Sequence, residues 1–340
     1  MIHRKSFVVQ KPGSLHHLNL QESSLPDPGM GEVTVAVRTI GLNYADIFAI
    51  MGLYSATPTG PFIPGLEYAG DIVAIGEGVT QWKPGDKIMG VTRFGGYTSH
   101  LNIDARYVFS LPVNWKYEEG AAFLVQVLTA YYALVPLGNL QQGQAVLIHS
   151  AAGGVGIQAN RIAQQLGAYT VGVVGDISKY ALLKKEGYNG AVVRTDNFRN
   201  DVKQALQGRE LNLVLEAAGG RYFTWSYELL AAQGRLVTYG SAGFTPSGEK
   251  PFYPKLIWQY ISRPKIDPLK MTRENKSIMG FNLIWIYDKT DLMHQLMQEI
   301  SALQLPAPHI GHRFSFLELP NALRLFQRGK TSGKLVIHTN

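Results

Sequence analysis

The sequence predicts an α/β protein of two domains, in which a doubly wound parallel sheet with helices on both faces accompanies a β-rich unit. The chain has 340 residues, enough for two domains with separate cores, and its 46% hydrophobic content is ordinary for a globular protein. Its first third alternates short apolar strands with turns rich in proline and glycine. From about residue 118 the pattern changes to strands that alternate with helices, which is typical of a parallel sheet covered on both faces.

The first part of the chain contains three predicted strands. Residues 32–37 read EVTVAV, and their apolar side chains recur at every second position, as in a half-buried strand. Residues 70–79 and 86–91 give two further strands. The turn signals between them include the run KPGD at 83–86. These short strands and tight turns indicate a compact β domain.

The second part of the chain begins with a predicted buried helix at 118–134. The units that follow are predicted as strands 145–149, 170–174, 191–194, 211–216 and 234–239 and as helices 157–166, 178–185, 199–206 and 223–230. Because each helix joins two consecutive strands, the strands are expected to run parallel. Residues 243–275 are irregular, aromatic and basic, so no element is predicted there. The remaining elements are predicted as a strand at 277–286, helices at 291–303 and 318–328, and a strand at 334–338.

Residues 146–156 read VLIHSAAGGVG, an apolar strand that leads into a glycine-rich turn before a helix. Only glycine allows positive φ in such a turn without steric cost. The backbone must also approach a pyrophosphate closely, so side chains at Gly153, Gly154 and Gly156 would obstruct it. The pyrophosphate would then lie on the free N–H groups at the helix start. The order of strand, turn and helix predicts a dinucleotide site, with an ordinary tight turn as the alternative.

Composition excludes several classes of protein. The net charge is +7, yet the chain has no block of Lys or Arg, so we expect no nucleic-acid partner. Cysteine is absent, which excludes disulfides and thiolate-bound zinc. The apolar run at 7–9 is too short for a signal peptide, and no apolar segment approaches the length of a membrane span. We therefore expect a cytoplasmic protein without a transmembrane segment.

Several motifs occur in one order along nearly the whole chain. They are GLNYAD at 41–46, PGLEYAG at 64–70, KPGD at 83–86, LTAY at 128–131, the turn at 151–156 and GKTSGKLV at 329–336. With them the chain resembles the medium-chain dehydrogenase/reductase superfamily, in its zinc-free quinone oxidoreductase branch. Residues 138–140 and 280–283 resemble the vesicle amine transport protein subgroup. The resemblance implies a GroES-like domain of residues 1–122 and 288–340 and a Rossmann domain of residues 123–287.

The zinc enzymes of this superfamily hold a catalytic metal with Cys, His and a third ligand. By motif position these ligands correspond to Asn43, Leu66 and Gln126. Leu66 cannot bind a metal, and the other two are poor zinc ligands. We therefore expect no metal ion, and no Lewis acid to polarise an alcohol. Glu67, which is retained from the zinc pattern, is interpreted as structural.

The end of the second parallel strand bears on the choice of cofactor. NAD sites usually place an acid there to bind the ribose 2′-hydroxyl, whereas here Val174 and Gly175 occupy the position and Asp176 comes slightly later. The resemblance puts Lys179 and Arg194 at a 2′-phosphate, which favours NADPH; solvated surface charges are the alternative. The further residues that the resemblance assigns to the cofactor, besides Gly175, are Asn43, Gln126, Thr129, Gly153, Gly154, Val155, Gly156, Gly219, Gly240, Phe281 and Lys334.

Without a metal, the chemistry left is direct hydride transfer from NADPH to an electron-poor acceptor. A small hydrophobic quinone or α,β-unsaturated carbonyl qualifies. The resemblance places three candidate catalytic residues near the substrate: Tyr54, Asn43 and Asp46. Tyr54 is the candidate to bind or protonate the substrate carbonyl, with a packed aromatic as an equal alternative. Asn43 would orient the substrate, the ribose or water, and Asp46 has a helix cap as its alternative role.

A second function stays open at this point. The vesicle-protein resemblance and the aromatic, basic stretch 252–265 suggest an NADPH-bound binding or lipid-handling protein with little turnover, which could touch a membrane surface. A cover over the substrate pocket or a dimer contact is the alternative role for that stretch. We also expect a homodimer, because an unpaired apolar edge strand at 277–286 would be an aggregation hazard in a monomer.

Overall fold

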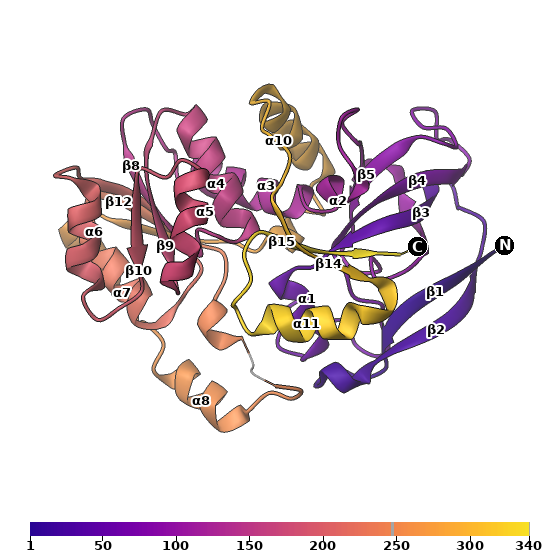
Figure 1. Cartoon of the computed structure of the whole chain (residues 1–340), viewed down its shortest axis with the longest axis horizontal. Helices are drawn as coiled ribbons and strands as arrows, with labels where there is room; N and C mark the ends of the chain where they lie inside the picture. The colour runs from indigo at the N-terminus through magenta and orange to yellow at the C-terminus, as the bar shows by residue number, and fades with distance from the viewer. Residues whose placement is uncertain (246–247, 340) are drawn as a thin grey trace.

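The computed structural model describes residues 1–245 and 248–339, and two domains lie side by side in it (Figure 1). One domain contains a parallel sheet of six strands in the order β10-β9-β8-β11-β12-β13. Its strands are β8 (Ala145–His149), β9 (Tyr169–Val174), β10 (Gly190–Val193), β11 (Leu211–Glu216), β12 (Leu230–Thr238) and β13 (Ser277–Gly280). The order changes direction between β8 and β11, which is the point where doubly wound sheets bind ligands.

The central strands and their helices follow from the sequence. All five residues of β8, AVLIH, are buried, as expected for a strand covered by helices on both faces. The helices that connect or cover the strands are α3 (Leu124–Tyr132), α4 (Gly154–Gln165), α5 (Tyr180–Lys185), α6 (Phe198–Leu206), α7 (Gly220–Leu229) and α10 (Thr290–Ala302). The predicted α/β class with a doubly wound parallel sheet is confirmed.

The second domain is rich in antiparallel strands and includes the end of the chain. A hairpin of β1 (Ile2–Val9) and β2 (Leu18–Leu25) lies beside a sheet in the order β14-β15-β3-β4-β5-β7, with β6 paired to β3. The members of this sheet are β3 (Glu32–Gly41), β4 (Glu67–Ile75), β5 (Lys87–Val91), β6 (His100–Asp104), β7 (Val108–Ser110), β14 (Ile310–Ser315) and β15 (Lys334–His338). Helices α1 (Tyr44–Ile50), α2 (Tyr117–Gly120) and α11 (Leu319–Gln327) accompany it. The exact domain boundaries stay a prediction.

The return of the C-terminus brings distant residues together. Strand β15 pairs antiparallel with β3, so that Val336 lies opposite Gly41. Lys334, at the start of β15, therefore lies close to the turn that leads from β3 into α1. Both chain termini are on the β-rich side of the molecule in Figure 1.

The predicted helix at 118–134 is divided in the structure. Helix α2 ends at Gly120, α3 begins at Leu124, and a π-helical turn continues over Ala133–Leu137 with Pro136 inside it. Contrary to expectation, this stretch, Tyr117–Leu137, has the length and hydropathy of a membrane span. In the most apolar 18-residue segment of this stretch, 78% is buried inside the protein. A core helix of a globular domain has the same character.

Two predictions for the segment before α10 are wrong. Residues 243–275 contain two helices, α8 (Tyr253–Ile261) and α9 (Pro268–Glu274), each with proline in its first turn. Proline is favoured there because an N–H group in the first turn of a helix has no acceptor within the helix, so its absence costs no hydrogen bond. The strand predicted at 277–286 ends at Gly280, because Leu283 and Ile284 turn into the core through a 3₁₀ turn.

The edge position of β13 leads to a prediction about the oligomer. Strand β13 pairs with β12, and no other strand of the described residues covers its outer side. An unpaired row of N–H and C=O groups invites pairing with another chain. We expect light scattering to give twice the mass of one chain at micromolar concentration. The mass of a single chain under these conditions would contradict the prediction.

Candidate functional site

A cavity of about 1360 Å³ lies between the two domains. It exceeds the usual 300–1,000 Å³ of pockets for single small ligands, so a dinucleotide and a substrate can share it. All residues predicted to contact the cofactor line it, namely Asn43, Gln126, Thr129, Gly153, Gly154, Val155, Gly156, Gly175, Lys179, Arg194, Gly219, Gly240, Phe281 and Lys334. Of the three predicted catalytic residues, Tyr54 and Asn43 line the cavity, whereas Asp46 does not.

The glycine turn fits a pyrophosphate. Contrary to expectation, Gly153, Gly154 and Gly156 do not adopt positive φ; Ser150, which follows β8, does so with φ of 54°. Helix α4 begins at Gly154, earlier than predicted. A Cβ on Gly156 would lie 2.6 Å from the carbonyl oxygen of Ser150 and 2.7 Å from Cα of Ala151, so only glycine fits. The N–H groups of the first turn of α4 have no acceptor within the helix. The turn therefore offers backbone donors and space to an anion.

A cationic end of the cavity lies beyond β9. The Arg194 guanidinium packs against Gly175, where a Cβ would be 2.8 Å from Nη2, and it stacks over Tyr222 at 5.9 Å. Asp176 does not line the cavity, and its carboxylate instead accepts a hydrogen bond of 2.8 Å from the backbone of Ser178. This end therefore offers a cation and no carboxylate from Asp176, which suits a phosphate.

Lys179 has a second role that the sequence did not reveal. Its ammonium donates hydrogen bonds to the carbonyl oxygens of Thr331 at 2.8 Å and Gly329 at 3.1 Å. These residues precede β15, so Lys179 connects the two domains. Burial lowers the pKa of Lys179, and the charge of Arg194 lowers it further.

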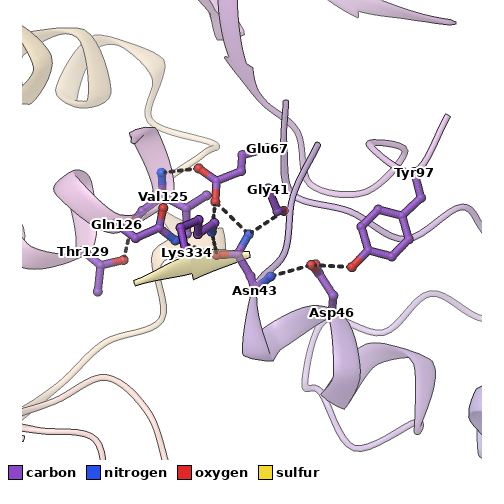
Figure 2. Close-up of polar contacts among 9 residues, drawn as sticks. All are labelled: Gly41, Asn43, Asp46, Glu67, Tyr97, Val125, Gln126, Thr129 and Lys334. Carbon is purple, nitrogen blue, oxygen red and sulfur yellow. Dashed lines mark hydrogen bonds and ion pairs between the residues drawn. The ribbon is translucent and has the colours of Figure 1, made fainter. Parts of the chain in front are cut away.

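Four buried polar side chains form one network beside the cavity (Figure 2). The ammonium of Lys334 is paired with Oε1 of Glu67 and donates to Oδ1 of Asn43 at 2.9 Å. The same Oδ1 accepts a hydrogen bond of 2.8 Å from Nε2 of Gln126. Glu67 also accepts from Nδ2 of Asn43 at 2.9 Å and from the backbone N–H of Val125 at 3.2 Å. Helix α3, strand β15 and the residue that precedes α1 are joined in this way to Glu67 on β4.

This network changes the interpretation of its members. The amide of Asn43 is engaged on both its oxygen and its nitrogen, so it is part of the cavity wall rather than a side chain with spare donors for substrate. Burial lowers the pKa of Lys334, and the carboxylate of Glu67 opposes that shift. The structural role expected of Glu67 is that of a counterion. Within the described residues, no group of three or more His, Cys, Asp or Glu side chains could hold a metal ion.

Asp46 lies outside the cavity and is fully buried. Its Oδ2 accepts hydrogen bonds of 2.8 Å from the backbone N–H of Asn43 and from the hydroxyl of Tyr97. Burial raises the pKa of Asp46 to about 7. These contacts favour the alternative role, a cap on the N-terminus of α1, over a catalytic one.

Tyr54 faces a partner from the other domain. Its hydroxyl donates a hydrogen bond of 2.7 Å to Oδ1 of Asn282, which follows β13. Burial raises the pKa of Tyr54 to about 12, so its hydroxyl stays protonated at neutral pH. Asn282 was not predicted as a site residue from the sequence. The sequence signal that could have identified it is a polar residue soon after the end of a parallel strand, here β13, where α/β sheets place ligand contacts.

Comparison with known families identifies the class of protein. The Alcohol dehydrogenase GroES-like domain matches residues 29–113, and the Zinc-binding dehydrogenase family matches residues 190–337. The human Synaptic vesicle membrane protein VAT-1 homolog is 32% identical over 324 residues, which cover 94% of this chain and 82% of that protein. The chain belongs to the medium-chain dehydrogenase/reductase superfamily, although its zinc-ligand positions hold Asn43, Leu66 and Gln126.

Solved structures support the same assignment. The quinone oxidoreductase of Thermus thermophilus, solved also in complex with NADPH, is 29% identical with a TM-score of 0.78, and the match covers 98% of this chain and 100% of that one. The CurK enoyl reductase is 27% identical with a TM-score of 0.84 and covers 99% of both chains. The predicted resemblance to the quinone oxidoreductase branch and to the VAT-1 homologues is confirmed, as is the combination of a GroES-like and a Rossmann domain.

Proposed function

We propose that this oxidoreductase transfers hydride from NADPH to a quinone or an α,β-unsaturated carbonyl. The observation that carries the proposal is one continuous cavity, which extends from the glycine turn and Arg194 to Tyr54 and Asn282. The cavity wall includes Leu53 and Leu66, which suit a hydrophobic acceptor. The names of the quinone oxidoreductase and enoyl reductase relatives agree with this substrate class.

Each part of the cavity has a role in the proposed reaction. When bound, NADPH supplies the hydride. The first turn of α4 binds the pyrophosphate, and Lys179 and Arg194 neutralise the 2′-phosphate. The apolar wall excludes water from the reacting atoms and holds the acceptor in place, and such positioning accounts for much of the rate in hydride transfer. When a substrate binds, the Tyr54 hydroxyl exchanges its hydrogen bond to Asn282 for one to the substrate carbonyl, and it provides the proton that accompanies the hydride.

The proposal is tested by NADPH consumption against a panel of quinones, enones and enals. We expect oxidation of NADPH with at least one class of conjugated acceptor. A protein that binds NADPH but oxidises it with none of them would contradict the enzyme function and support the second candidate described below.

Cofactor preference provides a more specific prediction. Arg194→Ala should weaken NADPH binding about tenfold and leave NADH binding nearly unchanged, because a hydrogen bond to a charged group contributes about 1.5–3 kcal/mol. Lys179→Ala should affect both cofactors, since Lys179 also holds the backbone at Gly329 and Thr331. The measurement is calorimetric titration with each cofactor.

The matched control for Arg194 is Arg199→Ala. Arg199 also stacks on an aromatic ring, that of Trp225 at 5.3 Å, but it does not line the cavity. We expect no change in either affinity for this variant. Equal affinities of the unmodified protein for NADPH and NADH would contradict the proposed cofactor preference.

A second candidate function is an NADPH-bound, lipid-handling protein with little turnover. Helix α8 carries exposed apolar side chains, among them Trp258 at 69% and Ile261 at 68%, with Lys255 and Arg263 beside them. Figure 1 shows α8 projecting from the body of the molecule. The vesicle membrane name of the VAT-1 relatives agrees with a membrane contact. Co-sedimentation with anionic vesicles tests it against the cytoplasmic location that we otherwise propose.

A further inference from the structure

Gln126 carries a buried oxygen without a hydrogen-bond donor in the described part of the chain. Its side chain is 4% exposed and lines the cavity. Nε2 donates to Asn43, whereas Oε1 has no partner. Gln126 also packs against the start of α4, where a Cβ on Gly154 would lie 2.8 Å from its Cγ. Buried polar atoms are almost always paired, and because Gln126 lines the cavity, a molecule bound there can supply the missing donor.

The orientation of the Gln126 amide follows from the charge of Lys334 (Figure 2). An ammonium group only donates hydrogen bonds, so Asn43 must turn Oδ1 toward Nζ of Lys334, at 2.9 Å. The amino group of Asn43 then donates to the carboxylate of Glu67 at 2.9 Å. Because Oδ1 of Asn43 accepts, Gln126 presents Nε2 to it at 2.8 Å. Oε1 of Gln126 is the atom left available for a ligand.

We infer that Lys334 and Glu67 are positioning residues. They fix the orientation of the Asn43 amide and, through it, that of the Gln126 amide, so that Gln126 offers an acceptor oxygen to the cofactor. The donor is an N–H or O–H group on the nicotinamide riboside half, because Gln126 lies where the first turn of α4 meets the part of the cavity that leads to Tyr54. The inference rests on the proposed function, since it requires a nicotinamide cofactor. It adds the buried ion pair to the residues that determine how that cofactor is held.

Calorimetric titration with two ligands tests the inference. NADPH contains the nicotinamide riboside, whereas adenosine 2′,5′-bisphosphate lacks it and keeps the 2′-phosphate. Gln126→Met should weaken NADPH binding about three- to tenfold, the usual contribution of one hydrogen bond, and leave adenosine 2′,5′-bisphosphate unchanged. The double variant Glu67→Gln/Lys334→Met removes both charges and leaves the 3.4 Å bond from Nδ2 of Asn43 to the carbonyl of Gly41 as the remaining restraint on that amide, so it should produce the same selective loss. Adding Gln126→Met to it should cause little further loss.

The matched control is Gln158→Met. Gln158 on α4 is also buried with an unpaired Oε1, but it does not line the cavity, so neither affinity should change. An unchanged NADPH affinity of Gln126→Met, or an equal loss for both ligands, would overturn the inference. So would a normal NADPH affinity of Glu67→Gln/Lys334→Met. If that double variant does not fold, Gln126→Met decides alone. An unmodified protein that binds neither ligand would overturn the proposed function as well.

Discussion

Tyr54→Phe should lower the rate of enone reduction about 10²–10⁴-fold, the usual contribution of a general acid. The Tyr54 hydroxyl lies in the cavity, 2.7 Å from Oδ1 of Asn282, and burial raises its pKa to about 12. It therefore keeps its proton until a substrate accepts it. An enone needs that proton on carbon after hydride arrives, whereas the reduced oxygen of a quinone is already stabilised. Quinone reduction should accordingly fall less, and steady-state rates on both substrates measure the difference.

The control for this variant is Tyr44→Phe. Tyr44 also lines the cavity, but its hydroxyl donates to the backbone carbonyl of Phe326 at 3.3 Å. We expect this variant to reduce both substrate classes at nearly the normal rate. If Tyr54→Phe behaves in the same way, Tyr54 contributes only packing.

The largest expected effect on stability comes from Lys334→Met. Removal of the ammonium leaves the Glu67 carboxylate buried without its counterion, and breaking such a pair usually costs about 3–5 kcal/mol. Glu67→Gln in the same chain should recover much of this loss, because the buried charge is then gone. The free energy of unfolding from denaturant titration measures both changes.

An exposed ion pair provides the comparison. Lys5 lies 3.6 Å from Glu22, and both side chains are more than half exposed. Lys5→Met should change the free energy of unfolding by at most about 1 kcal/mol, as is usual at the surface. Similar effects of Lys334→Met and Lys5→Met would show that the buried pair is not needed for stability.

Local sequence patterns predicted most of the parallel sheet. Strands such as β8 and β11 are short apolar runs bounded by polar or glycine-rich turns. The first and last residues of each of these two strands agree with the prediction. Helix α8 was missed because its apolar residues do not form a buried stripe, and none of its residues is buried. Strand β13 was predicted too long because an apolar run does not distinguish a strand from a turn that enters the core.

The sequence predicted which residues line the cavity but not which of them pair with one another. Motif order indicated residues that line the cavity, and Gly156 has a local reason, because a Cβ there would meet the backbone of Ser150 and Ala151. The pairing of Lys334 with Glu67 joins residues 267 positions apart, and that of Tyr54 with Asn282 joins residues 228 apart. Such contacts are created by the return of β15 to the first sheet and by the closure of the two domains. No local pattern contains them.

The proposed hydride transfer is tested most directly with NADPH that carries deuterium at the transferred position. The protein is incubated with the labelled cofactor and an enone, and mass spectrometry locates deuterium in the product. We predict one deuterium at the carbon β to the carbonyl, in the presence of a chelator as in its absence. A reduced product without deuterium at this carbon, or a labelled product formed only when metal is available, would contradict the account.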